Sequence, residues 1–200
     1  MNHLTTLNAL NNQYFALRHG ESVANQKGLI VSSPENGIKN YGLSETGQKQ
    51  IRDSIESFNA LNNKTRIISS DFLRTAESAQ IAHQLLQAEG EIQFSPLLRE
   101  RFFGDYELKD NSFYKNVWDM DLQGSSHNNN NVESADAVLE RTTSLIATLE
   151  TNFKGESFLL VSHGDALQIL QTAFSKVPAS THRSLTHLQT AEIRELVLQN

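Results

Sequence analysis

Apolar residues along the chain alternate between short strand-like runs and longer helical stripes. The strand-like runs end at polar or turn-forming residues and lie at 14–17, 66–69, 91–94, 158–162 and 192–198. Stripes with apolar spacings of three and four predict helices that begin near Ser44, Asp71, Ser134 and Asp165. This alternation predicts an α/β fold, a three-layer sandwich with a mostly parallel sheet and helices on both faces. Because the last run alternates charged and apolar residues, we expect it at a half-exposed sheet edge.

Two stretches interrupt the alternation. Residues 28–41 are rich in Ser, Pro, Asn and Gly and are expected to form a loop. Residues 104–131 hold a predicted short helix at 113–120, and the stretch closes with four consecutive asparagines at 128–131. We therefore expect a single domain over residues 1–200 with a small cap or lid inserted at 105–131.

Composition narrows the class of protein. The net charge of −6 argues against a general affinity for nucleic acid or for an anionic membrane. The absence of cysteine excludes disulfides, thiolate catalysis and zinc–thiolate sites. The polar N-terminal stretch lacks the features of a signal peptide, and no apolar run reaches bilayer length, so we expect a cytoplasmic protein. The sequence leaves the oligomeric state open.

The first strand-like run ends at Arg18, His19 and Gly20, the most informative positions of the chain. The carboxyl ends of strands in an open α/β sheet are where ligands bind, and the glycine is expected to let the backbone turn sharply into a helix. A cation, an imidazole and a helix N-terminus would meet there, which suits an anionic substrate. The fourth run repeats the pattern with His163 and Gly164. Because the histidine–glycine pattern follows two strands of the same predicted sheet, a functional role is a better explanation than coincidence.

Two further groups follow the middle strands. Arg74 lies about one turn into the second helix, where it could reach back over the strand ends or instead pair with Asp71 on a solvated face. Glu100 stands between Arg99 and Arg101, and its simplest interpretation is a surface ion pair. Two imidazoles, two guanidiniums and one carboxylate in one place would suit phosphoryl transfer, because a phosphate needs several fixed donors.

At this point the chain resembles the histidine phosphatase superfamily, which includes cofactor-dependent phosphoglycerate mutases and many phosphatases. The matching blocks occur in the family's order at residues 18–25, 43–47, 69–76, 98–104 and 161–165. The match runs in pieces over nearly the whole chain. One departure is Ser78, which stands where the family usually has Thr.

The resemblance implies roles for individual residues. His19 would be the nucleophile that takes the phosphoryl group, and Glu100 the general acid and then the base. The phosphate would be bound by the residues that surround the nucleophile, namely Arg18, Arg74, His163, Asn25 through its amide, Gly164 through its backbone N–H, and Ser22, which could instead serve only as a helix cap. No metal and no cofactor are expected. The remaining histidines, at 3, 83, 127, 182 and 187, are expected to be surface or structural residues.

The family contains both hydrolases and mutases. A mutase must hold a doubly phosphorylated intermediate, but the 105–131 stretch has only Lys109 and Lys115 as cations among five acidic residues. This favours a metal-independent phosphomonoester hydrolase that acts on a small phosphorylated metabolite. A phosphoglycerate mutase is the alternative within the family, since the Arg-Glu-Arg sequence at 99–101 resembles mutases. A non-catalytic phospho-ligand binding module is the alternative from another class, and a phosphatase acting on a phosphoprotein lies between the two.

Overall fold

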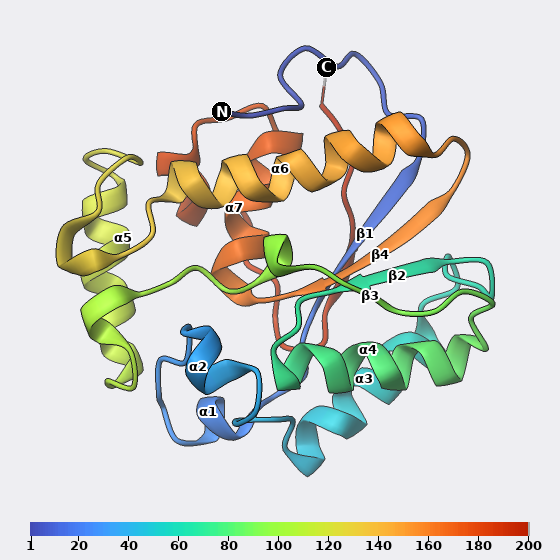
Figure 1. Ribbon diagram of the computed structural model, residues 1–200, viewed down its shortest axis with the longest axis horizontal. Coiled ribbons are helices and arrows are strands. Elements are labelled where there is room, and N and C mark those ends of the chain that lie inside the picture. Colours follow the sequence, from blue (N-terminus) through green and yellow to red (C-terminus); the bar gives the residue numbers. More distant parts are fainter. Residues whose placement is uncertain (200) are drawn as a thin grey trace.

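A computed structural model describes residues 1–199 and contains a five-stranded sheet with the order β3-β2-β4-β1-β5 (Figure 1). The strands are β1 (Gln13–Arg18), β2 (Arg66–Ser69), β3 (Gln93–Phe94), β4 (Ser157–Ser162) and β5 (Ile193–Glu195). The first four run parallel, and β5 pairs antiparallel with β1 at the sheet edge. The predicted α/β class with a mostly parallel sheet is confirmed.

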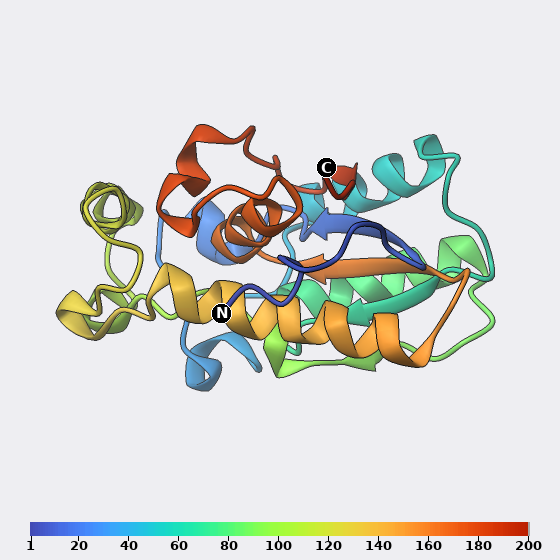
Figure 2. The same cartoon turned by 90° about the horizontal axis from the view of Figure 1, so that it is seen from above.

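Helices cover both faces of this sheet. They are α1 (Val23–Gln26), α2 (Pro34–Gly37), α3 (Glu45–Ser57), α4 (Leu73–Leu86), α5 (Tyr114–Asp121), α6 (Ala135–Asn152) and α7 (Gly164–Phe174). Short 3₁₀ turns lie at Pro96–Leu98, Gly104–Tyr106, Asn111–Phe113, Asn129–Asn131 and Ala179–Ser184. The pair α3 and α4 lies on one side of the sheet, and α6 and α7 lie on the other (Figures 1 and 2). Within residues 1–199, no helix combines the length and apolarity needed to cross a bilayer.

The central strands are buried on both faces, which explains their nearly continuous apolar sequences. In β1, Tyr14 and Ala16 pack into the cluster beneath α6 and α7, whereas Phe15 and Leu17 pack into the cluster beneath α3 and α4. The same alternation in β2 and β4 divides the core into two layers. The sheet is therefore held rigidly from both sides, and its strand ends are fixed in space.

The pairing of β1 with β4 determines where the chemistry-bearing residues lie. Arg18, the last residue of β1, is in register with Ser162, the last residue of β4. The next residues are His19 and His163, and the backbone N–H of His19 donates to the carbonyl of Ser162 at 3.1 Å. The parallel register thus brings the two imidazoles out of the sheet side by side.

The helix starts follow the predicted caps, with one correction. Ser44 and Ser134 cap α3 and α6 by accepting backbone N–H bonds. The expectation that Asp71 opens α4 was wrong, because Phe72 occupies the cap position and the Asp71 carboxylate pairs instead with Arg99 at 2.6 Å. A bidentate bond to a guanidinium is stronger than a helix cap on a neutral N–H.

The edge strands are shorter than their sequence patterns. The runs predicted at 91–94 and 192–198 narrow to the two-residue β3 and the three-residue β5. Each of these strands pairs with a neighbour on one side only, so the backbone groups on its outer side have no partner strand in the sheet. The predicted short helix near 113–120 is α5, and the loop predicted at 28–41 also contains the one-turn helix α2.

The 105–131 segment and the 28–41 loop pack against each other. Ile30, Phe103, Val117 and Val132 form a third apolar cluster, separate from the two layers of the sheet core. Backbone bonds reinforce the contact, since the N–H of Ile30 donates to the Lys109 carbonyl at 2.9 Å. In both views α5 lies at one end of the molecule, away from the edge strand β3 and its neighbour β2 (Figures 1 and 2).

Gly20 is required for a different reason from the one its sequence context suggests. It does not have a positive φ, so the turn itself does not need a glycine. A Cβ at Gly20 would instead lie 2.3 Å from the Gly47 carbonyl oxygen, and a Cβ at Gly47 would lie 2.0 Å from the Glu21 carbonyl oxygen. Two glycines therefore let the start of α3 touch the backbone that follows His19.

We expect Gly47→Ala to destabilise the fold by about 1–3 kcal/mol, because the added methyl group meets backbone that cannot move aside. Urea unfolding followed by circular dichroism measures the change. Gly90→Ala is the matched control, since a Cβ there has nothing within 4 Å, and its effect should stay within about 0.5 kcal/mol. Equal stability of the two variants would contradict this account of the contact.

Candidate active site

His19 and His163 lie against each other at the carboxyl ends of β1 and β4. Their ring centroids are 5.3 Å apart, with an interplanar angle of 65°. Both side chains are almost completely buried, with 3% and 0% exposure. Both rings are therefore shielded from solvent and pack against each other.

The hydrogen bonds of His19 define which ring nitrogen is reactive. Nδ1 lies 2.7 Å from the Gly20 carbonyl oxygen, which can only accept, so Nδ1 carries the hydrogen. Nε2 accepts from Arg74 Nε at 3.1 Å. Burial, together with the charges of Arg74 and Arg18, lowers the pKa of His19 well below its ordinary value. The ring is thus neutral at physiological pH, with its lone pair on Nε2.

Arg74 is buried beside His19 and does not lie on a solvated helix face. Its exposure is 4%, and Nη2 donates to the Val31 carbonyl at 2.9 Å. Nη1 is buried and has no partner within residues 1–199. The alternative in which Arg74 pairs with Asp71 was wrong, since Asp71 is bound by Arg99. The start of α4 therefore directs an unpaired guanidinium nitrogen toward the histidines.

His163 is held from behind by Ser70. The Ser70 hydroxyl oxygen accepts from the Phe72 N–H at 3.3 Å and lies 2.9 Å from His163 Nε2. We assign the Ser70 hydroxyl hydrogen to this contact, which makes Nε2 the acceptor and puts the ring hydrogen on Nδ1. Nδ1 is buried without a partner in the described chain. Burial and the Arg74 charge lower the pKa of His163 well below its ordinary value, so this donor is a neutral imidazole.

Arg18 supplies a second guanidinium to the same space. Its Nη1 donates to the Leu188 carbonyl and to His187 Nε2, both at 2.9 Å. Its Nε is buried and has no partner among residues 1–199. Arg18 Nε, Arg74 Nη1 and His163 Nδ1 are thus three buried donors that lack acceptors. Each such group costs stability unless a ligand satisfies it, and the ligand that suits three N–H donors is an anion.

Ser22 and Asn25 form a capping box at the start of α1. Asn25 Oδ1 accepts from both the backbone N–H and the hydroxyl of Ser22 at 2.9 Å. This leaves the Nδ2 donors of Asn25 for other partners, and both residues line the cavity described below. The Ser22 hydroxyl is engaged in the cap, which agrees with the simpler of its two predicted roles. Gly164, the first residue of α7, also lines the cavity.

Glu100 is buried and forms no ion pair with the arginines that flank it. Its exposure is 8%, and Oε1 accepts the backbone N–H groups of Arg101 and Ala166 at 3.0 and 3.1 Å. Burial and the nearby negative charge of Asp165 raise the pKa of Glu100 above its ordinary value, despite the opposing charge of Arg74. The interpretation as a surface ion pair was wrong, because Arg99 and Arg101 both turn to other carboxylates.

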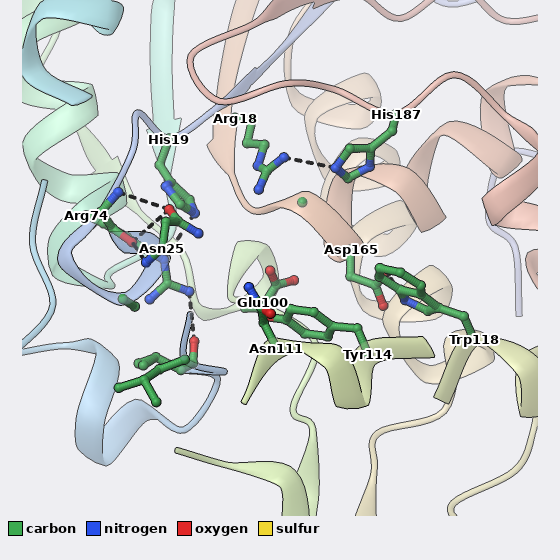
Figure 3. A pocket seen from close by; sticks show the side chains of 15 residues that line it. Arg18, His19, Asn25, Arg74, Glu100, Asn111, Tyr114, Trp118, Asp165 and His187 are labelled. Atoms are coloured by element: carbon green, nitrogen blue, oxygen red, sulfur yellow. Dashed lines mark hydrogen bonds between the residues drawn. The ribbon is translucent and has the colours of Figure 1, made fainter. Parts of the chain in front are cut away.

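A cavity of about 190 Å³ joins these groups (Figure 3). Arg18, His19, Arg74 and Glu100 line one part of it, whereas His163 packs against the His19 ring at a centroid distance of 5.3 Å and is not itself a lining residue. The rest of the lining comes from α1 and the loop after it, from the 3₁₀ turn before α5, from α5, from the start of α7 and from the segment before β5, namely Ala24, Leu29, Val31, Asn111, Tyr114, Trp118, Asp165 and His187. The cavity thus has a cationic part and a largely uncharged part.

The sequence did not indicate the residues of this second part of the lining, and four of them carry polar or aromatic groups that matter for the site. Tyr114 and Trp118 come from α5, which packs over the strand ends, and Asp165 is the second residue of α7. His187 was expected to be a surface or structural residue, but it lies in the cavity wall and contacts Arg18. The only available signal was its position in the chain, a few residues before the last strand, and that is weak.

A comparison with protein-family models identifies the chain. The model described as histidine phosphatase superfamily (branch 1) matches residues 14–200. The chain belongs to the histidine phosphatase superfamily.

Curated relatives of this superfamily member include both bacterial and plant proteins. The chain is 30% identical over 181 residues to a probable phosphoglycerate mutase, GpmB, of Photorhabdus laumondii, with 86% of this chain and 79% of the relative covered. It is 26% identical over 166 residues to phosphoglycerate mutase-like protein 4 of Arabidopsis thaliana, with 77% and 67% covered.

Solved structures share the fold of this histidine phosphatase superfamily member. A putative alpha-ribazole-5'-P phosphatase from Escherichia coli superposes with a TM-score of 0.74 and 22% identity, covering 94% of this chain and 90% of the other. A mycobacterial glucosyl-3-phosphoglycerate phosphatase in complex with VO3 gives a TM-score of 0.75 and 21% identity, with 92% and 91% covered. At these identities the likeness establishes the fold.

In this superfamily member a buried ion cluster joins Glu100 to α5. Arg101 is fully buried and donates to both carboxylate oxygens of Asp121 at 2.7 and 2.8 Å, and to Asp165 at 3.2 Å. Trp118 Nε1 donates to the second oxygen of Asp165 at 2.9 Å. His127 also contacts Asp121 at 2.8 Å. The segment that carries Glu100 is therefore attached to α5, which lines the cavity, through the ion pair between Arg101 and Asp121.

We expect Arg101→Met to destabilise the protein by about 3–5 kcal/mol, because it leaves two buried carboxylates without their cation. Thermal or urea unfolding provides the measurement. Arg66→Met is the control, since Arg66 pairs with Glu156 at a half-exposed site and should contribute about 1 kcal/mol or less. A small loss at Arg101, similar to that at Arg66, would show that the cluster does not hold the segment in place.

Proposed function

We propose that this protein is a metal-independent phosphomonoester hydrolase that acts on a small phosphorylated metabolite through a phosphohistidine on His19. The observation that carries the proposal is a neutral imidazole with its lone pair on Nε2, held beside Arg74, in a site with three buried donors that lack partners within residues 1–199. A phosphate monoester satisfies those donors with its equatorial oxygens and presents its phosphorus to His19 Nε2. Membership of the superfamily supports this arrangement as a phosphoryl-transfer site.

In the first step, Nε2 of His19 attacks phosphorus while the ester P–O bond breaks. The charge that develops on the equatorial oxygens is stabilised by Arg18, Arg74 and His163, which are fixed before substrate arrives. The leaving oxygen takes a proton from Glu100. Its raised pKa favours the protonated form, and the proton resides on Oε2 because Oε1 already accepts two N–H groups.

In the second step, a water molecule attacks the phosphohistidine and the P–N bond breaks. The Glu100 carboxylate, having given up its proton, takes one from this water. The electron pair returns to His19 Nε2, and inorganic phosphate leaves. The Nδ1–H bond to the Gly20 carbonyl keeps the ring in one orientation through both steps.

The cavity walls favour hydrolysis over isomerisation. Among the described residues that line it, the only permanent cations are Arg18 and Arg74, and both belong to the first phosphate position. The remaining wall has aromatic and aliphatic side chains, uncharged polar groups such as the amides of Asn25 and Asn111, and the buried carboxylate of Asp165. A second phosphate would find no arginine or lysine in this part of the lining and would face a negative charge. Arg183 contacts Trp118 and His187 but is not a lining residue. We therefore propose a small leaving group without a second anionic group.

A phosphoglycerate mutase is the second candidate, because curated relatives with 30% identity are named as probable phosphoglycerate mutases. A mutase would need 2,3-bisphosphoglycerate as a primer and would move phosphate between positions of one molecule. A hydrolase releases inorganic phosphate without a primer. A non-catalytic binding module would bind phosphate and turn nothing over.

We expect His19→Ala to abolish phosphate release and to remove a phosphoenzyme that is labile in acid and stable in alkali, because Nε2 forms the covalent bond. A screen of phosphomonoesters with excess chelator, with and without the primer, measures release, and an alkaline quench traps the phosphoenzyme. His83→Ala, which removes an imidazole from α4 away from the cavity, serves as the matched control and should retain activity.

Retention of the phosphoenzyme in His19→Ala would place the nucleophile elsewhere, and loss of activity in chelator would contradict the metal-independent mechanism. Isomerisation that depends on the primer would favour the mutase. Tight phosphate binding without turnover of any ester would favour the binding module.

We expect Glu100→Gln to slow hydrolysis of an alkyl phosphate by about 10²–10⁴-fold, because the poor leaving group needs the proton. The nitrophenolate leaving group needs no proton, so the rate of nitrophenyl phosphate hydrolysis should fall much less. For the wild type acting on the alkyl ester, kcat/KM should fall as pH rises through the raised pKa of Glu100, since only the protonated form donates. This fall of kcat/KM with rising pH should be absent in the Glu100→Gln variant. Equal losses on both esters would remove Glu100 from its role.

A further inference from the structure

Arg18 uses one end of its guanidinium for the protein and leaves the other end for a ligand. Both hydrogens of Nη1 are engaged, one by the Leu188 carbonyl and one by His187 Nε2, each at 2.9 Å. Nε is buried without a partner in the described chain. The Nε and Nη2 edge is the fork that binds an oxyanion with two parallel bonds, so whatever holds Nη1 determines where that fork points.

The orientation of Gln168 is fixed by its surroundings. Its amide nitrogen donates to the carbonyls of His182 and Leu185, both at 2.7 Å. Two carbonyl acceptors leave only one choice for the amide, because an oxygen in that position would face two oxygens. Gln168 Oε1 must therefore point the other way, and it lies 3.1 Å from His187 Nδ1. Gln168 itself is fully buried in α7.

These contacts determine the tautomer of His187. Oε1 of Gln168 requires a hydrogen on Nδ1, and the Arg18 N–H requires a lone pair on Nε2. The opposite tautomer would set two lone pairs against each other on one side and two hydrogens on the other. Arg183 lies 3.4 Å from the same Nδ1, but its guanidinium stacks on the Trp118 ring, 3.8 Å from the ring centroid.

The charge state of His187 agrees with this tautomer. Burial and the charges of Arg18 and Arg183 lower its pKa to about 4, against weaker opposing effects of Asp165 and Glu192. The ring is therefore neutral at physiological pH. An imidazole that accepts from a guanidinium must be neutral, because an imidazolium has no lone pair to offer.

Close packing holds this arrangement against the start of α7. A Cβ on Gly164 would lie 3.3 Å from Arg18 Nε and Cζ, and 3.4 Å from His187 Cε1. The glycine thus lets both side chains rest directly on the helix start. Arg18, His187 and the first turn of α7 form one packed unit at the wall of the cavity (Figure 3).

We propose that His187 is a positioning residue for phosphate binding, which accepts a hydrogen bond from Arg18 and so aims the free guanidinium fork at the phosphate, with Gln168 setting the required tautomer. The inference rests on the proposed phosphate site but does not require hydrolysis. His187 acts through Arg18 and takes no part in proton transfer. His187 belongs to the C-terminal segment, whereas Arg18 is the last residue of β1. Their hydrogen bond therefore also attaches the C-terminal segment to the end of β1.

The test compares His187→Leu with His187→Gln. Leucine fills the space without an acceptor, whereas glutamine presents an amide oxygen near the place of Nε2. We expect the Leu variant to bind orthovanadate and inorganic phosphate about 10- to 100-fold more weakly than the wild type, since a hydrogen bond to a charged group is lost. The Gln variant should recover most of that affinity. Isothermal titration calorimetry measures binding without any turnover, and thermal unfolding checks that each variant is folded.

Kinetics provide the second readout. For any ester that is hydrolysed, the Leu variant should lose kcat/KM by a similar factor whatever the leaving group, because Arg18 contacts only the phosphoryl oxygens. His83→Leu is the matched control and should match the wild type in every measurement.

Oxyanion affinity in His187→Leu equal to that of the wild type would overturn the proposal, as would a Gln variant no better than the Leu variant. A loss confined to one leaving group would make His187 a substrate contact rather than a positioning residue. If the wild type binds oxyanions in this pattern but hydrolyses no ester, the proposed hydrolase function fails and the role of His187 stands. If the wild type binds no oxyanion, both proposals fail.

Discussion

The parallel pairing of β1 with β4 is the constraint on which the site depends. Both strands are buried on two faces, and their last residues, Arg18 and Ser162, are directly opposite each other in the ladder. The chain positions that follow are imidazoles in both cases, so the register alone brings two side chains 144 positions apart in sequence, residues 19 and 163, into contact. A shift by one residue would turn one ring into a core layer. The two-layered core makes such a shift costly.

Backbone carbonyls hold both His19 and the two guanidiniums beside it, and no carboxylate within residues 1–199 forms an ion pair with Arg18 or Arg74. The Gly20 carbonyl accepts from the neutral His19 ring, whereas the Val31 and Leu188 carbonyls accept from Arg74 and Arg18. This leaves the guanidinium charge uncompensated and some N–H groups unused, which a folded protein ordinarily avoids. Such a site lowers the stability of the free protein and raises it when an anion binds, because the ligand binds only the folded state. The unpaired donors thus lower the stability of the free protein and favour binding of an anion.

A buried ion cluster connects the segment that carries Glu100 to helix α5. Glu100 precedes Arg101, whose side chain binds Asp121 at the end of α5. Asp165, which also accepts from Arg101, raises the pKa of Glu100 through its negative charge. The position of the carboxyl group, its proton affinity and the closure of the cavity thus depend on one buried cluster. This link explains why a region that is polar and asparagine-rich in sequence is nevertheless attached firmly at one end.

The sequence by itself determined the elements whose signals are local. The strands β1, β2 and β4 and the serine caps of α3 and α6 follow from periodicity and capping chemistry, and the ordered blocks around His19 and His163 pointed to the superfamily. Only the tertiary structure decided the partners of Asp71 and Glu100, the reason for Gly20, and the place of His187. These depend on contacts between segments far apart in the chain. A residue's own neighbours fix its backbone preference, but its charge, tautomer and partner are set by whatever packs against it.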